Sequence, residues 1–169
     1  MGTDPTDEWE ERVAAAWATL EDYDEDHAAD FRAVIEALVA ELPVDSPVAP
    51  FERACAWDST GHSDKAVPLY REALERGLSG YRARRTSVQL SSSLRNIGRP
   101  EEGVKLLTAE LDAPSDELDD AVRAALALCL ADLRREREGL SLVLGALARH
   151  LPRYQQSMAN YARLLVEPG

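Results

Sequence analysis

The sequence has no apolar run that approaches the roughly 18–20 residues needed to cross a bilayer. Its N-terminus also lacks the basic and apolar stretches of a secretory signal peptide. We therefore expect no membrane partner and a cytoplasmic location. Cysteine is scarce as well, with Cys55 and Cys129 lying 74 residues apart. We expect both to be free thiols that pack as small hydrophobes, which fits a reducing compartment.

The sequence also shows no residues arranged for catalysis or for metal binding. The three histidines, His27, His62 and His150, lie in unrelated segments without metal-ligand spacing. His62, Ser63 and Asp64 match a catalytic triad in composition only, because neighbours in a turn cannot adopt the nucleophile–base geometry. No glycine-rich phosphate loop follows a strand pattern, and no strand is predicted at all. The sequence thus predicts a non-enzyme that needs no metal or cofactor.

Charge of both signs is present but unevenly distributed. Residues 1–30 contain eleven acids and one base, which accounts for most of the net charge of −12. Residues 81–99 contain five arginines and no acid. Such asymmetry concerns partners rather than fold, and the net charge makes nucleic acid a poor partner. Only two lysines accompany seventeen arginines, a composition that suggests a GC-rich bacterial genome.

An internal repeat is the most informative feature of the chain. Seven positions recur with an offset of 37 residues: Ala54, Trp57, Gly61, Val67, Leu69, Tyr70 and Leu74 fall on Ser91, Leu94, Gly98, Val104, Leu106, Leu107 and Leu111. A weaker third copy follows with an offset of 36, at Ala127, Leu130, Arg134, Leu140, Leu142, Val143 and Leu147. A period in the thirties is typical of stacked helical hairpins.

Capping residues, prolines and glycines divide the chain into predicted helices. Their approximate ranges are 7–21, 26–42, a third between Pro47 and Gly61, 64–77 (with Pro68 inside it), 81–97, 100–112, 116–133, 137–150 and 152–166. The predicted fold is therefore all-α, an α-α superhelix. An acidic N-terminal helical extension (1–43) precedes a repeat region (44–169). That region holds repeats at about 47–80, 81–114 and 116–150 and a capping helix at 152–166.

The stretch 51–61 followed by 66–74 resembles a tetratricopeptide repeat. Ala54 and Ala66 would let two helices approach closely, and Gly61 would form the turn. With the stretch Leu94–Glu101 and the ending Asn160–Ala162, the chain resembles a group-5 subfamily of bacterial tetratricopeptide repeat proteins over roughly residues 47–166. The resemblance implies a superhelix, a protein-interaction role and possible dimerisation. The sequence departs from the pattern in its third copy, where Arg134 replaces the turn glycine.

In that family the first helix of each hairpin lines a concave groove, so the predicted helix 81–97 offers a candidate site. Positions spaced four, three and four residues apart form a polar stripe on it, and further arginines and a neighbouring helix extend it. The candidate peptide-binding residues are Arg85, Gln89, Ser92, Arg95, Asn96, Arg99, Phe51 and Asp58. Arginine suits carboxylate recognition, so we expect an acidic peptide or partner segment. Alternatively, Arg82, Arg84 and Arg99 are solvated, or they are paired with Glu101, Glu102 and the helix surface at Glu72 and Glu75.

The acidic N-terminal helix has an apolar stripe that we expect to be buried against another surface. The stripe consists of Trp9, Val13, Trp17 and Leu20. Three arrangements are open: the helix folds back over the arginine-rich helix and shields the groove, it reaches a second copy to form a homodimer, or it packs as a simple cap. The final helix, with Met158, Tyr161 and Leu165, offers another dimer contact. The competing function is thus a structural homodimer or assembly subunit.

Overall fold

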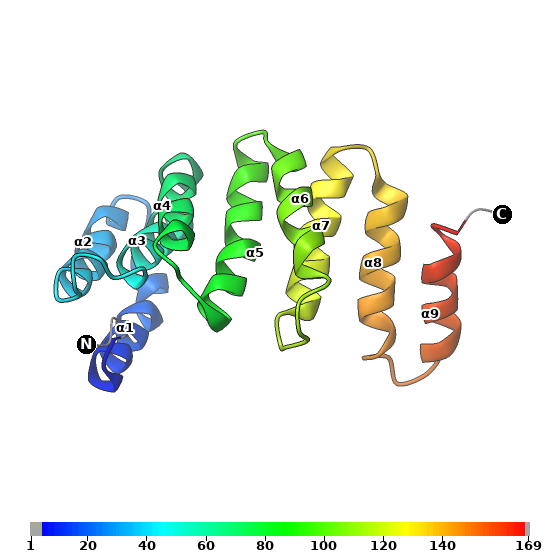
Figure 1. Ribbon diagram of the computed structural model, residues 1–169, viewed down its shortest axis with the longest axis horizontal. Coiled ribbons are helices and arrows are strands. Elements are labelled where there is room, and N and C mark those ends of the chain that lie inside the picture. Colours follow the sequence, from blue (N-terminus) through cyan, green and yellow to red (C-terminus); the bar gives the residue numbers. More distant parts are fainter. Residues whose placement is uncertain (1–4, 168–169) are drawn as a thin grey trace. The chain divides into compact units, whose positions relative to one another are not determined.

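The computed structural model describes residues 5–167, and within them it contains helices and no strand (Figure 1). Its elements are α1 (Asp7–Ala18), a 3-10 turn (Leu20–Asp22), α2 (Ala28–Val39), α3 (Val48–Ser59), α4 (Ser63–Glu75), α5 (Gly80–Asn96), α6 (Pro100–Glu110), α7 (Asp119–Asp132), α8 (Glu136–Ala148) and α9 (Gln155–Leu164). The all-α prediction is confirmed. Of the acidic residues in the N-terminal segment, Asp4 lies outside the described residues.

The chain divides into two compact units, residues 1–86 and 87–169, with the boundary inside α5. One hydrophobic cluster of the first unit lies between the apolar faces of α2 and α3. It contains Phe31, Ile35, Val39, Ala49 and Ala56, and Trp17 packs edge-on against Phe31 with ring centroids 5.1 Å apart.

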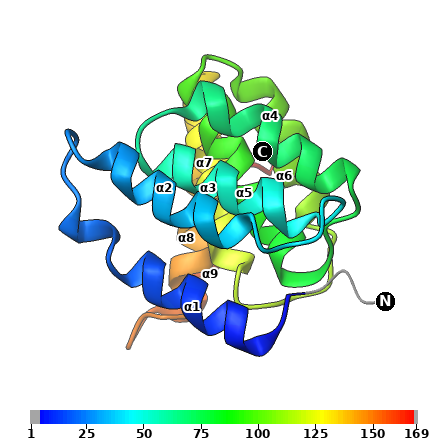
Figure 2. The same ribbon diagram turned by 90° about the vertical axis from the view of Figure 1, so that its left-hand side faces the viewer.

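α1 packs against α2, so the apolar stripe of the N-terminal helix finds its cover within the first unit (Figure 2). Trp9 and Val13 are buried. The Trp9 indole also donates a hydrogen bond to the carbonyl oxygen of Leu38, at 2.8 Å. Thr6 caps α1, because its hydroxyl accepts a hydrogen bond from the Trp9 backbone N–H.

The second unit has its core between α6 and α7, at Leu107, Val122, Leu126 and Leu130. In Figure 1, α7, α8 and α9 follow one another side by side in this unit, and direct contacts join α7 to α8 and α8 to α9. Cys129 is buried here and Cys55 is buried in the first unit, and both are free thiols, as predicted.

Helix pairs in this fold approach closely at one repeated position. A Cβ atom added to Gly103 would lie 2.8 Å from the Cys129 sulfur and 3.3 Å from the carbonyl oxygen of Ser91. One repeat later, a Cβ on Gly139 would lie 2.9 Å from the carbonyl oxygen of Ala127. Ser91 and Ala127 are themselves one repeat apart, so the same crossing recurs in both hairpins and only glycine fits there.

The turn between the helices of each hairpin uses a left-handed residue. Gly61 and Gly98 have φ of 82° and 77°, and Arg134 has φ of 59° at the third equivalent position. The arginine therefore keeps the backbone conformation of the glycine that it replaces, at some cost in strain.

Pro68 lies within α4, as predicted, and the helix continues past it. The final helix begins at Gln155 rather than at Pro152, since Tyr154 has a left-handed backbone, φ 67°, that interrupts the helix before it.

Candidate functional site

The arginine-rich segment predicted from the sequence forms α5, and its first turns face α3 in the first unit. The guanidinium carbons of Arg82 and Arg85 lie 5.9 Å and 5.4 Å from the centre of the Phe51 ring. Phe51 is fully buried, so its ring can contact the two guanidinium groups but is not accessible to a ligand at the surface. A guanidinium over an aromatic face is stabilised by the ring quadrupole and is held in a defined orientation.

Arg82 and Arg85 line one side of a pocket of about 440 Å³. The other lining residues are Pro47, Val48, Gly77, Leu78, Ser79 and Tyr81. The N-terminal ends of two helices, α3 at Val48 and α5 at Gly80, lie at this pocket. The N-terminus of a helix carries partial positive charge. The two helix N-termini and the two guanidinium groups therefore all favour the binding of an anion in this pocket.

Beneath the arginines lies a carboxyl group that the sequence did not single out. Glu52 is only 3% exposed and accepts a hydrogen bond from the Trp17 indole at 2.8 Å. Its carboxylate lies 3.9 Å from the Arg82 Nε atom. Burial raises the pKa of Glu52 above its ordinary value, and the bond from Trp17 and the charges of Arg82 and Arg85 partly oppose that rise.

Arg82 is already engaged by the acidic N-terminal segment. Its Nη2 atom lies 2.6 Å from the carboxylate of Glu10, a residue of α1. Arg85 differs from it: the contacts described for its guanidinium are the Phe51 ring and the electrostatic influence on Glu52, with no hydrogen-bonded carboxylate among residues 5–167.

The other two predicted arginines are paired within the second unit. The Arg95 Nε atom lies 2.7 Å from Asp132 on α7, and Arg99 binds Glu102 at the start of α6. Asp58, predicted as a groove residue, accepts hydrogen bonds from Tyr70 and Ser63 inside the first hairpin. Arg99 is thus paired with Glu102, one of the acids that the alternative expectation named. Arg95 is also paired, but with an acid that the alternative did not name.

The remaining predicted residues belong to the part of α5 in the second unit. Ser92 and Asn96 are exposed, and Gln89 is half-buried. The predicted set is therefore divided: Phe51, Asp58 and Arg85 lie in the first unit, and the polar stripe beyond Arg85 lies in the second.

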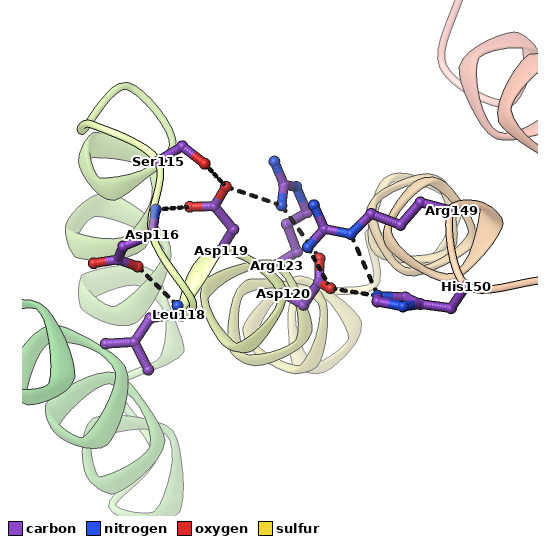
Figure 3. A network of polar contacts seen from close by, with 8 residues as sticks. All are labelled: Ser115, Asp116, Leu118, Asp119, Asp120, Arg123, Arg149 and His150. Carbon is purple, nitrogen blue, oxygen red and sulfur yellow. Dashed lines mark hydrogen bonds and ion pairs between the residues drawn. The ribbon is translucent and has the colours of Figure 1, made fainter.

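A second polar cluster joins the beginning of α7 to the end of α8 (Figure 3). Asp120 lies 2.5 Å from Arg149, 2.9 Å from His150 and 3.3 Å from Arg123. The contact with His150, followed by that with Arg149, lowers the pKa of Asp120 below its ordinary value. The cluster ties the two helices of a hairpin together, and we assign it a structural role.

Among residues 5–167, no group of three or more His, Cys, Asp or Glu side chains is arranged to hold a metal ion. Within those same residues, every helix is too short or too polar to span a membrane.

A family model described as a tetratricopeptide repeat, the group-5 model, matches residues 47–165. The match covers α3 to α9 and leaves out α1 and α2. No curated protein and no solved structure matches the chain.

Proposed function

Since the chain belongs to the tetratricopeptide repeat family, whose repeats generally mediate protein–protein interactions, we propose that it binds an acidic segment of a partner protein at α5. The family fold is a non-catalytic interaction scaffold, and the proposal extends that non-catalytic role to this chain. It places the protein in a bacterial cytoplasm, which the buried free thiols and the arginine-rich composition support.

The observation that carries the proposal is the state of Arg85. Its guanidinium is held over Phe51, borders a pocket and has no hydrogen-bonded carboxylate in the described part of the chain. Arginine presents a planar fork of donors that matches a carboxylate, and a guanidinium already oriented by a ring loses less entropy on binding. A glutamate or aspartate side chain of a partner supplies the missing acceptor.

The rest of the predicted polar stripe belongs to the second unit, where it forms a separate candidate contact surface. Gln89, Ser92 and Asn96 supply neutral donors and acceptors for the backbone of a bound segment. Arg95 and Arg99 carry positive charge beside them, although each is paired with an acid. We therefore assign the main ionic contact to Arg85.

Fluorescence anisotropy with a labelled oligoglutamate peptide tests this proposal directly. We expect binding to the wild type, weaker binding to Arg85→Gln, and none of comparable strength with oligoglutamine of the same length. The matched control is Arg153→Gln, which removes the same charge from an exposed position outside α5. Equal affinities for Arg85→Gln, Arg153→Gln and the wild type would exclude Arg85 as the contact.

A homodimer or assembly subunit is the second candidate function, and the exposed apolar side of α9 favours it. Tyr161 and Leu164 are 60% and 53% exposed, whereas Met158 and Leu165 are partly buried. The Trp9 and Val13 stripe is covered within its own chain. Sedimentation at low and high salt distinguishes the cases, because a dimer held by α9 persists at high salt and a Tyr161→Glu variant disrupts it.

A further inference from the structure

The contact between α1 and α5 places an acidic residue of the chain on an arginine of the proposed site. Glu10 and Arg82 are 36% and 28% exposed, so their ion pair lies at the surface of the first unit. Arg82 shares both the Phe51 ring and the pocket lining with Arg85. A carboxylate therefore already occupies one of two guanidinium groups that border the same cavity.

α1 is held in this position by contacts other than the ion pair. Trp17 donates to Glu52 on α3, and Trp9 donates to the carbonyl oxygen of Leu38 on α2. Arg12 pairs with Glu41 beyond the end of α2. These anchors lie on either side of Glu10 in the sequence, so α1 stays docked when the Glu10 side chain alone leaves Arg82.

We propose that Glu10 is an intrachain competitor at the arginine pocket: an acidic partner segment displaces the Glu10 carboxylate from Arg82 and then engages Arg82 and Arg85 together. This inference rests on the proposed function and adds its regulation. Exchanging one carboxylate for another on a partly exposed arginine conserves the number of ion pairs. The α1 carboxylate therefore reduces affinity without closing the site.

The competing carboxylate is specific to position 10 rather than a property of the acidic segment as a whole. Glu11 is its neighbour on α1, is exposed, and has no ion pair within residues 5–167. Glu10→Gln and Glu11→Gln change the net charge equally, so a difference between them isolates the contact with Arg82. The repulsion of an acidic ligand by the segment is the same in both.

The test is a set of oligoglutamate titrations by fluorescence anisotropy on full-length variants. We expect Glu10→Gln to bind the probe about three- to fivefold more tightly than the wild type, the upper part of the range expected from a partly exposed ion pair. Glu11→Gln should remain within about twofold of the wild type, as screening at physiological salt weakens distant charges. Glu10→Asp, which keeps the charge but shortens the side chain, serves as a second variant should Glu10→Gln lose stability.

A double-mutant cycle between positions 10 and 82 completes the test. Arg82→Gln should change affinity little when Glu10 is present, and should abolish the gain when combined with Glu10→Gln. Equal affinities for Glu10→Gln and Glu11→Gln, in a protein whose binding depends on Arg85, would overturn the competition and leave the proposed function intact. Absence of probe binding in every variant, Glu10→Gln included, would overturn both.

Discussion

The indole of Trp17 donates its hydrogen bond to Glu52, 35 positions later in the sequence, at a distance of 2.8 Å. The bond joins the acidic N-terminal helix to α3 beneath the arginine pocket. It also gives a carboxylate that is only 3% exposed a hydrogen-bond donor, although burial remains the largest influence on its pKa and raises it. The consequence is a dependence of stability on pH that is opposite in sign to that of the surface acids.

The raised pKa of Glu52 means that the folded chain holds a proton there at pH values where the unfolded chain has lost it. This group therefore lowers the free energy of unfolding as pH rises from its unfolded pKa, near 4.5, to its higher folded pKa. We expect Glu52→Gln to gain stability relative to the wild type over that interval, by about 1.4 kcal/mol for each unit of pKa difference. Urea unfolding of both proteins between pH 4 and 8 measures it, and a constant difference across that range would contradict the prediction.

Asp120 is expected to behave in the opposite way. Its pKa is lowered by His150 and Arg149, so its contribution to stability is present above the ordinary pKa of 3.8 and disappears as pH falls through the folded value. Asp120→Asn should cost less than about 1 kcal/mol at neutral pH, because the pairs are partly exposed. The cost should vanish in strong acid. Asp116→Asn changes the same charge outside the contacts with His150 and Arg149 and serves as the control.

Two glycines of α8 should respond oppositely to the same substitution. A Cβ on Gly139 meets the Ala127 backbone at 2.9 Å, whereas the nearest atom to a Cβ on Gly145 is 4.0 Å away. We expect Gly139→Ala to destabilise the protein by about 1–3 kcal/mol through overpacking. Gly145→Ala should stabilise it by about 0.5–1 kcal/mol, since alanine is the better helix former. Thermal unfolding ranks the two variants, and a stabilised Gly139→Ala would show that the helices can separate at no cost.

Arg134 offers a stabilising substitution at the third turn. Its φ of 59° strains any residue with a Cβ atom, so Arg134→Gly should raise the free energy of unfolding by up to about 1 kcal/mol. The reciprocal change, Gly98→Ala, places a Cβ at φ 77° and should lower it by a similar amount. Differential scanning calorimetry compares the pair; a destabilised Arg134→Gly would mean that the arginine side chain makes a contact worth more than the strain.

Most of the fold was predictable because it depends on local signals. The turns were predictable from the glycines at 61 and 98, and the close helix crossings from the recurring small residues. The turn at Arg134 was predictable only from the offset of the repeat, because arginine itself does not indicate a left-handed backbone. The interruption at Tyr154 was not predictable, since nothing in an aromatic residue signals a left-handed backbone.

The candidate site was predictable only in part, because ion pairing depends on tertiary distance. Helical spacing identified the arginines of α5 but not which acid reaches which arginine. The partner of Arg82 lies 72 positions away, and the buried Glu52 sits in an apolar helix where the residue itself looks like a surface acid. Arg85 differs from Arg82 in having no hydrogen-bonded carboxylate in the described part of the chain, and the sequence pattern does not predict this difference.

The buried thiols give each compact unit its own reporter. Cys55 lies in residues 1–86 and Cys129 in residues 87–169, and both are sealed from solvent in the folded chain. Alkylation of either thiol thus requires that its own unit open, and mass spectrometry of the two labelled peptides resolves the opening rates separately. A single chain without engineered probes can report which half loosens first when temperature, salt or an acidic partner is varied.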